Sequence, residues 1–198
     1  MIVFGITGGS GSGKTSVSKM LEKLGVHIID TDVIAHEIVE PNSDCLNELV
    51  DYFGDSILND DKTLNRKKLA SIAFSDKQKT EALINITHKY IKAEVVKDIN
   101  TTDAELVGID GAVIIGSNVE PLCEFIVSVI ADKQSRITRI KTRDNITDEQ
   151  AIQRINAQND DEFYKENSMY IIYNNGDIAQ LESDVVGLFN KIKGNSFE

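Results

Sequence analysis

The sequence contains no tryptophan and only two cysteines, and the scarcity of cysteine excludes a class of protein. Cys45 and Cys123 lie far apart, so neither a disulfide-stabilised scaffold nor a zinc site is expected. No apolar run approaches the roughly 18 to 20 residues that cross a bilayer. The N-terminal residues lead directly into a predicted strand, without the basic region of a leader peptide. We therefore expect a protein of the reducing cytoplasm with no membrane partner.

Basic residues are also scarce, because 21 Lys and Arg face 32 Asp and Glu and give a formal net charge of −11. Such a balance argues against a general surface for nucleic acid. An anionic substrate would then need a local cluster of basic side chains. With 198 residues, 41% of them hydrophobic, the chain is expected to form a single domain over residues 1–198. We expect it to be a monomer or a weak homo-oligomer.

Glycine is concentrated in one place, since residues 8–15 read GGSGSGKT and satisfy the phosphate-loop pattern. Residues 1–6 form a short apolar run typical of a buried strand. After the loop, apolar residues recur at steps of three and four from Val17 to Leu24, as on one face of a helix. A strand, a glycine loop and a helix form the context that the pattern requires. A flexible Gly/Ser linker would explain neither the Lys-Thr ending nor the flanking elements.

The chemistry of this loop is that of a nucleotide-phosphate site. Glycines let the backbone curl until its N–H groups point inward, and the following helix adds the positive end of its dipole. Lys14 would place a charge at the outer phosphates, and the Thr15 hydroxyl would hold Mg²⁺. The residues predicted to bind ATP in this segment are Gly9, Ser10, Gly11, Ser12, Gly13, Lys14, Thr15 and Ser16.

Further strands are predicted at residues 27–29, 105–109, 125–131 and 169–173, and they alternate with helical patterns. The alternation predicts an α/β fold of the P-loop NTPase type, with a doubly wound, five-stranded parallel sheet and helices on both faces. Residues 33–100 interrupt the alternation with helix-like segments only. We expect this excursion to be a helical subdomain that binds the second substrate.

Two capping boxes are predicted to open helices. Ser75 with Gln78 would open a long helix, and Thr147 with Gln150 would open another.

Carboxylates follow two of the predicted strands. Asp30 and Asp32 end the second strand, and Asp110 ends the third, at the edge of the sheet where ligands bind. Asp32 suits a group that orients the attacking hydroxyl and accepts its proton. Asp30 suits either the site or a helix cap, and the sequence leaves both open. Asp110 would assist Mg²⁺ through water, with a plain turn as the alternative.

Three arginines follow the central strand at helical spacing. Arg136, Arg139 and Arg143 fall on one helix face, where they could embrace ATP or form a solvated, ion-paired surface. Arginine supplies planar, multi-donor contacts that stabilise charge on a transferring phosphoryl group. Arg139 and Arg143 are the stronger candidates for that role, and Arg136 is left open.

Because of these residues and of the segments given below, the chain resembles the dephospho-coenzyme A kinase family over about residues 2 to 190. The resemblance implies transfer of the γ-phosphate of ATP, with Mg²⁺, to dephospho-coenzyme A. It implies catalytic roles for Lys14, Asp32, Arg139 and Arg143, and a lid at about residues 144–165. The segments and residues that carry the resemblance are 5–15, 24–32, Glu40-Pro41, Phe53-Gly54, 64–66, Leu69, Phe74, His88, Arg139, 143–144, Gln158 and 174–176.

The resemblance also implies contacts with both substrates. Arg139, Arg143 and Asn174 would join the loop in binding ATP. The implied substrate-binding residues are Thr7, Asp32, Arg66, His88 and Asp110, and the implied metal contacts are Thr15 and, through water, Asp110.

The chain departs from the family pattern at several positions. His36 stands where the family usually carries Arg, and Gly116 stands where it carries Glu in the loop after the third strand. Lys89 and Tyr173 replace a usual Pro and Asp. These departures leave two alternatives to the expected activity, namely another small-molecule kinase acting on a nucleoside or nucleotide, and a nucleotide-binding module without phosphoryl transfer.

Overall fold

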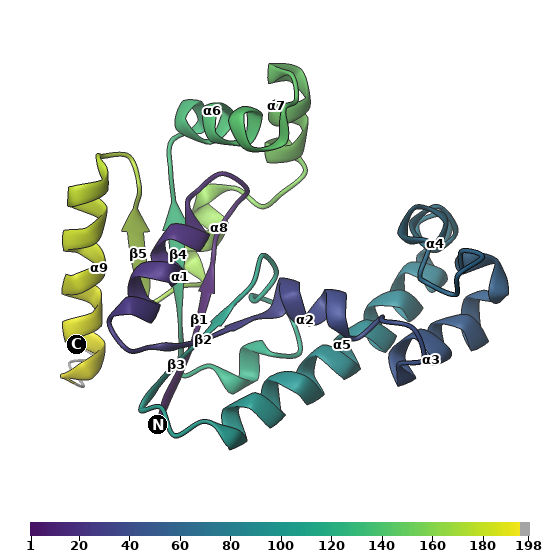
Figure 1. Ribbon diagram of the computed structural model, residues 1–198. Helices are drawn as coiled ribbons and strands as arrows, with labels where there is room; N and C mark the ends of the chain where they lie inside the picture. The colour runs from purple at the N-terminus through teal and green to yellow at the C-terminus, as the bar shows by residue number, and fades with distance from the viewer. Residues whose placement is uncertain (195–198) are drawn as a thin grey trace. The chain divides into compact units, whose positions relative to one another are not determined.

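A five-stranded sheet with the strand order β2-β3-β1-β4-β5 forms the centre of the fold in the computed structural model, which describes residues 1–194 (Figure 1). The pairings of β1 with β3, of β1 with β4 and of β4 with β5 are parallel. The α/β class and each predicted strand are confirmed, the strand ends to within one residue. The strands are β1 (Ile2–Thr7), β2 (His27–Asp30), β3 (Leu106–Asp110), β4 (Phe125–Ile130) and β5 (Tyr170–Tyr173).

The middle of the sheet is apolar on both faces. β3 and β4 are buried at every position, and β1 lies between them. Full burial explains why both strands read as continuous apolar runs rather than alternating patterns. Because the strands are parallel, their carboxyl ends meet at one edge, and the loop after β1 lies there.

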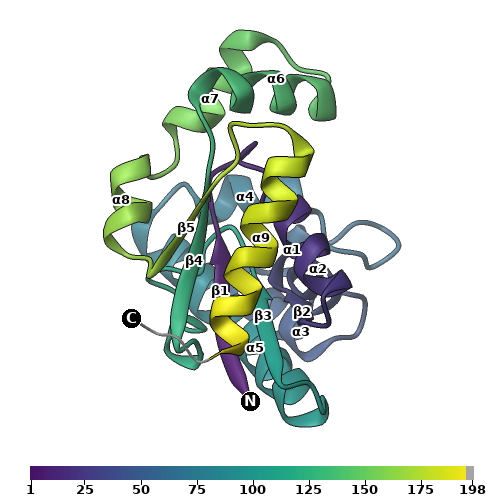
Figure 2. The same ribbon diagram turned by 90° about the vertical axis from the view of Figure 1, so that its left-hand side faces the viewer.

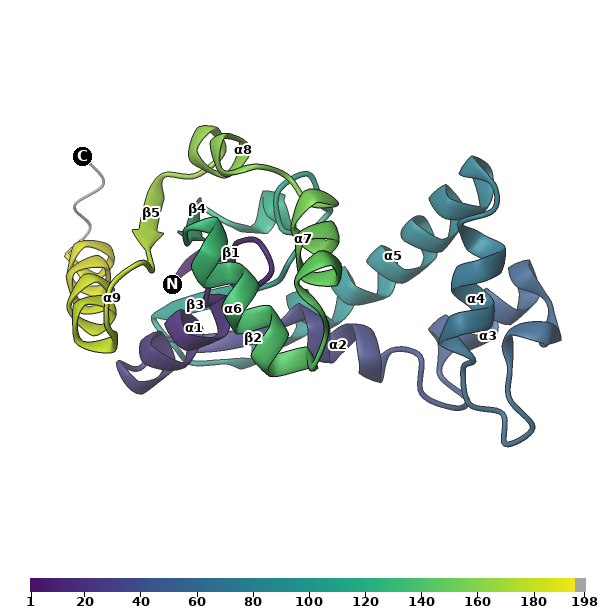
Figure 3. The ribbon, with the colours of Figure 1, turned by 90° about the horizontal axis from the view of Figure 1, so that it is seen from above.

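The chain divides into two compact units, of which the first contains residues 1–29 and the segment from residue 102 onward. Helices α1 and α9 pack against each other and cover one face of its sheet (Figure 2). Helix α8 packs against β4 (Figure 3). The helices of this unit are α1 (Lys14–Lys23), η2 (Glu120–Leu122), α6 (Lys133–Asp144), α7 (Asp148–Asn156), α8 (Asp161–Glu166) and α9 (Ile178–Lys193).

The second unit, Asp30–Thr101, is helical. The long helix α5 packs against α2, α3 and α4. The predicted helical excursion at 33–100 falls within this unit, and its role in binding substrate stays a prediction. The helices are α2 (Thr31–Glu37), α3 (Asp44–Phe53), η1 (Asp55–Ile57), α4 (Arg66–Ala73) and α5 (Lys77–Thr101).

Of the two predicted capping boxes, one is confirmed and one is wrong. Thr147 and Gln150 make both reciprocal hydrogen bonds at the start of α7. At α5 the cap is Asp76, whose Oδ1 accepts a hydrogen bond from the Gln78 N–H at 2.7 Å. The Ser75 hydroxyl instead donates to the Ile72 carbonyl at 2.8 Å. Because Asp caps a helix as well as Ser does, the α5 helix begins one residue later than predicted.

Across residues 1–194, no helix is both long enough and apolar enough to traverse a bilayer.

Candidate active site

The glycine loop runs from the end of β1 to the first residue of α1 and has the backbone conformation that its glycines permit. Gly13 precedes the helix with φ +99°, in the left-handed region. A Cβ atom at Gly13 would collide with the Asn174 side-chain amide. Glycine is therefore required there for two independent reasons, its φ value and the close approach of Asn174.

Side chains from distant segments hold the carbonyl groups of this loop from outside. Arg139 Nη1 donates to the carbonyls of Gly11 and Ser12, each at 3.2 Å, and Asn174 Nδ2 donates to the Ser12 carbonyl at 2.8 Å. Arg139 Nη2 in turn donates to the Asn174 carbonyl at 2.9 Å. In a trans peptide the C=O and N–H groups point in opposite directions. Holding the Ser12 carbonyl outward therefore directs the Gly13 N–H inward, toward the space for phosphate.

Lys14 and Asp110 form an ion pair beside the loop. Lys14 is the first residue of α1, and Asp110 ends β3, where it pairs in register with Ile6 of β1. Asp110 is only 3% exposed, so the ammonium group is held next to a buried carboxylate. The pair places a cation at the carboxyl edge of the sheet, where the helix dipole of α1 also favours an anion.

Thr7 and Thr15 stand at the two ends of the loop. Thr7 is the last residue of β1, and its buried hydroxyl donates to the Ala112 carbonyl at 3.4 Å. Thr15 follows Lys14 in the first turn of α1 and is exposed, so its hydroxyl is accessible to a ligand.

Unlike Arg139, Arg143 makes no hydrogen bond to the loop among those described for residues 1–194. Its guanidinium donates to the carboxylate of Asp144 at 2.7 and 2.9 Å, and Arg154 bonds to the same carboxylate. Hydrogen bonding to Arg143, its charge and the neighbouring Arg154 lower the pKa of Asp144 to about 2. A role for Arg143 with ATP would require its side chain to exchange Asp144 for the nucleotide, and that role stays a prediction.

The Asp144 cluster should stabilise the fold in a way that acid removes. The pKa of Asp144 is about 2 in the folded chain, below the usual value near 3.9 for an unfolded one. The stabilisation is thus present above pH 4 and is lost as pH falls through the folded pKa, with about half remaining at pH 3. We expect Asp144→Asn to lower the melting temperature by the same amount at pH 7 and pH 5, and by less at pH 3. Glu182→Gln, on the exposed side of α9, is the control, and a difference that stayed constant down to pH 3 would contradict the assignment.

In the helical unit, Asp30 caps α2. Its Oδ1 accepts hydrogen bonds from the N–H groups of Asp32 at 2.8 Å and Val33 at 3.1 Å. The capping alternative for Asp30 is thus the one that the structure supports. Asp32 lies in the first turn of the same helix, and its predicted catalytic role stays a prediction.

Two other predicted substrate residues lie in this unit. Arg66 begins α4, and its Nη2 is 2.9 Å from Nδ1 of His36, which stands where the resemblance implies an Arg. The imidazole therefore adjoins a cation that is expected to bind substrate. His88 is half-buried on α5, and burial lowers its pKa, which favours the neutral ring.

Two residues that contact the loop were not among the predicted site residues, although the sequence had left Arg136 open and Gln158 carries part of the family resemblance. Arg136 is buried and donates from Nε to the Ser10 carbonyl at 2.9 Å. Gln158 accepts a hydrogen bond at Oε1 from the Ser10 N–H at 2.7 Å. The available signal was the position of Arg136 one helical turn before Arg139, which places both on the face toward the loop.

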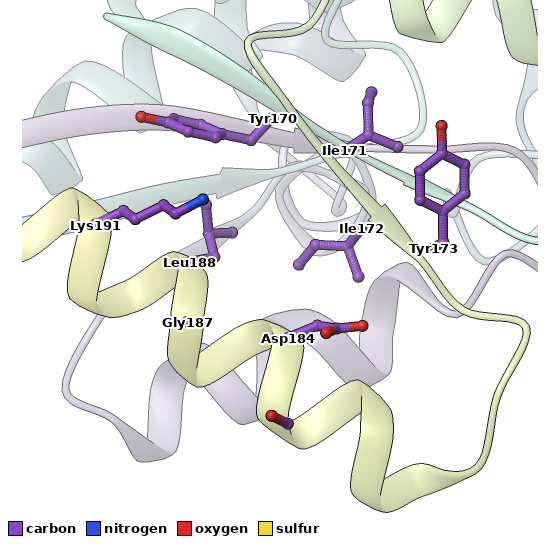
Figure 4. Close-up of a pocket in the computed structure, with 9 residues that line it drawn as sticks. Tyr170, Ile171, Ile172, Tyr173, Asp184, Gly187, Leu188 and Lys191 are labelled. Atoms are coloured by element: carbon purple, nitrogen blue, oxygen red, sulfur yellow. The ribbon is translucent and has the colours of Figure 1, made fainter. Parts of the chain in front are cut away.

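Two hollows in the first unit differ in their relation to this site. One, of about 570 Å³, is lined by Arg136 and Gln158 together with Lys133 and the segment 159–162, so it adjoins the loop contacts. The other, of about 350 Å³, lies between β5 and α9, with Tyr170 and Lys191 in its lining (Figure 4). It contains none of the residues predicted for the site.

The chain is similar to known proteins over nearly its whole length. The family model described as dephospho-CoA kinase matches residues 2–180. A dephospho-CoA kinase of Lactobacillus johnsonii is 34% identical over 191 residues, which cover 95% of this chain and 96% of that protein. The crystal structure of TT1252 from Thermus thermophilus has a TM-score of 0.83 at 25% identity, with 96% and 97% of the two chains covered. A dephospho-CoA kinase from Campylobacter jejuni has a TM-score of 0.69 at 26% identity, with 98% of each chain covered.

Proposed function

Because the chain belongs to the dephospho-CoA kinase family, we propose that it transfers the γ-phosphate of ATP to the ribose 3′-hydroxyl of dephospho-coenzyme A. The observation that carries the proposal is the phosphate loop whose carbonyls are held outward beside the Lys14–Asp110 pair. Phosphoryl transfer asks mainly for positioning and for stabilisation of charge, and this arrangement supplies both.

ATP would lie with its β- and γ-phosphates on the loop N–H groups and on the Lys14 ammonium. The hydroxyl of Ser12 supports this placement, because it is a buried polar atom without a hydrogen-bond partner in residues 1–194. Leaving such a group unpaired costs about 1–3 kcal/mol. A phosphate oxygen is the partner that its position in the loop would offer.

The residues present fit a Mg²⁺ ion that is held jointly with ATP. In residues 1–194, no three His, Cys, Asp or Glu side chains lie close enough to form a metal site of their own. Mg²⁺ usually keeps several waters and is bound by few protein ligands together with substrate phosphates. The exposed hydroxyl of Thr15 would hold it directly and Asp110 through water, and the bound ion would neutralise charge on the phosphate oxygens.

The chain's own residues would carry the remaining steps. Asp32 would orient the attacking hydroxyl and accept its proton. Arg143 would neutralise charge on the transferring group once its side chain exchanges Asp144 for the nucleotide. Arg139 would do so after releasing the loop carbonyls that it holds, while the lid at about residues 144–165 would exclude water. In the helical unit, Arg66 and His88 would bind dephospho-coenzyme A.

We place this activity in the cytoplasm. Cys45 and Cys123 are both free thiols. Burial raises the pKa of Cys45 to about 11 and that of Cys123 to about 12, so both stay protonated and unreactive. Free, protonated thiols support a reducing compartment.

The proposal is tested by ADP release from purified protein with Mg-ATP, with and without dephospho-coenzyme A, and by the mass of the product. We expect ADP release that depends on the acceptor and a product heavier by one phosphate group, at the mass of coenzyme A. ATP binding without this product would overturn the acceptor assignment and lead to a screen of nucleosides and nucleotides. If no acceptor in that screen were phosphorylated, the chain would be a nucleotide-binding module.

A further inference from the structure

Ser10 of the phosphate loop has both of its backbone groups held by side chains from outside the loop. Its N–H donates to Gln158 Oε1 at 2.7 Å, and its carbonyl accepts from Arg136 Nε at 2.9 Å. Arg136 Nη2 also donates to the same Gln158 oxygen at 3.3 Å. One arginine and one glutamine therefore form a closed set of hydrogen bonds around a single loop residue.

Arg136 is built into this position rather than placed at the surface. Its side chain is 7% exposed, although an unpaired guanidinium is costly to bury. The guanidinium lies so close to Gly9 that a Cβ atom there would collide with it. Its Nη1 is also 3.7 Å from the carboxylate of Asp161 in the first turn of α8. Its burial is thus compensated by contacts to the loop, to the segment after α7 and to α8.

We propose that Arg136, acting through Gln158 and Ser10, is a positioning residue of the phosphate loop that fixes its geometry for the β- and γ-phosphates of ATP. The peptide units before and after Ser10 are each held by one of the two side chains. Arg139 and Asn174 hold the next two carbonyls in the same manner. Arg136 thus extends this support by one residue toward the start of the loop. The inference rests on the proposed function only in taking ATP as the ligand of the loop.

The same contacts connect the loop to the predicted lid. Gln158 follows α7 and Asp161 begins α8, so both contacts of Arg136 outside the loop lie within residues 144–165. A displacement of this segment would therefore be transmitted to Ser10 directly through Gln158 and also through the Arg136 guanidinium.

The test is equilibrium binding of ATP and ADP to the native chain, Arg136→Met, Arg136→Lys and Gln158→Leu, with no acceptor present. Lys141→Met is the matched control, because Lys141 is a long cation on the same helix that pairs with Asp148. We expect Arg136→Met to weaken both nucleotides about tenfold, as expected for a lost hydrogen bond to a charged group. Arg136→Lys should lie between this variant and the native chain, and the control should change binding less than twofold.

Two further measurements separate positioning from a merely structural role. The double variant Arg136→Met/Gln158→Leu should bind ATP no more than about twofold more weakly than Arg136→Met, because both side chains act on Ser10. The KM for dephospho-coenzyme A should stay within twofold in Gln158→Leu, a milder variant that does not empty the buried site.

The proposal would be overturned if the losses of ATP affinity in Arg136→Met and Gln158→Leu multiplied in the double variant. It would also be overturned if both single variants bound ATP as tightly as the native chain. A native chain that bound neither ATP nor ADP would overturn it together with the proposed function. A native chain that bound ATP but did not phosphorylate dephospho-coenzyme A would overturn only the acceptor, since the expected loss of nucleotide affinity would still be measured.

Discussion

Lys14→Met is expected to lower kcat/KM for ATP by about three orders of magnitude, because a charge next to the transferring phosphoryl group stabilises the transition state. Methionine keeps a long, flexible side chain and removes only the ammonium group and its hydrogen bonds. Lys14 begins α1 at the carboxyl edge of the sheet, and it is the only lysine within residues 8–15 of the loop. The measurement is steady-state ADP release at varied ATP. Lys19→Met, at an exposed position on the same helix, is the control.

The ion pair with Asp110 makes a second variant necessary. Removing one partner of a buried carboxylate destabilises a protein in addition to any effect on catalysis. We therefore expect Lys14→Met to lower the melting temperature, and Lys14→Met/Asp110→Asn to recover part of that loss without recovering activity. Recovery of activity in the double variant would show that the ammonium group acts on the fold rather than on ATP.

Asp32→Asn is expected to lower kcat by about 10²- to 10⁴-fold, the usual range for a lost general base, with ATP affinity nearly unchanged. Asparagine preserves the shape of the side chain and can still hydrogen-bond to a hydroxyl, but it cannot accept the proton. The measurements are turnover at saturating substrates and equilibrium binding of ATP.

The matched control is Asp44→Asn. Asp32 and Asp44 both lie in the first turn of a helix of the same unit, so each substitution removes the same favourable interaction with the helix dipole. Only Asp32 is assigned to chemistry. Unchanged turnover in Asp32→Asn, or an equal loss in Asp44→Asn, would remove Asp32 from the role of base.

The sheet and the loop could be predicted because their signals are local. The strands appear as continuous apolar runs, and the glycines with Lys14 stand in one stretch of eight residues, 8–15. The start of α5 was misplaced by one residue because Ser75 and Asp76 are both good caps and only the fold selects between them.

The support of the loop could not be predicted in the same way. Arg136 and Gln158 reach Ser10 from positions more than a hundred residues later in the chain, and their spacing carries no pattern of its own. The arginine spacing put Arg139 and Arg143 on one helix face, but it could not show that Arg139 contacts the loop whereas Arg143 pairs with the adjacent Asp144. Tertiary contacts decide what each arginine of one helix face does.

In the loop after β3, the family resemblance implies a Glu at the position of Gly116, and the loop has its carboxylate at another position. Gly116, which stands in place of that Glu, has φ +78°, and its N–H donates to the Glu120 carboxylate at 2.5 Å. The carboxylate of this loop is therefore bound to the loop's own backbone from a position four residues later. Acceptor-dependent ADP release decides whether transfer proceeds with this arrangement.

The position of β1 in the middle of the sheet also determines when the molecule can fold during its synthesis. Ile2 pairs with Leu106, and Phe4 pairs with Phe125, so β1 is synthesised about a hundred residues before its neighbours in the sheet. At roughly 5–20 residues per second, β1 waits about five to twenty seconds for its first partner. Until then its apolar side chains have no sheet to cover them, and such non-local pairing is slow to form. The phosphate loop depends on the pairing of β1 and on the hydrogen bonds from Arg136 and Arg139 of α6. It is thus among the last parts of the nascent chain to fold.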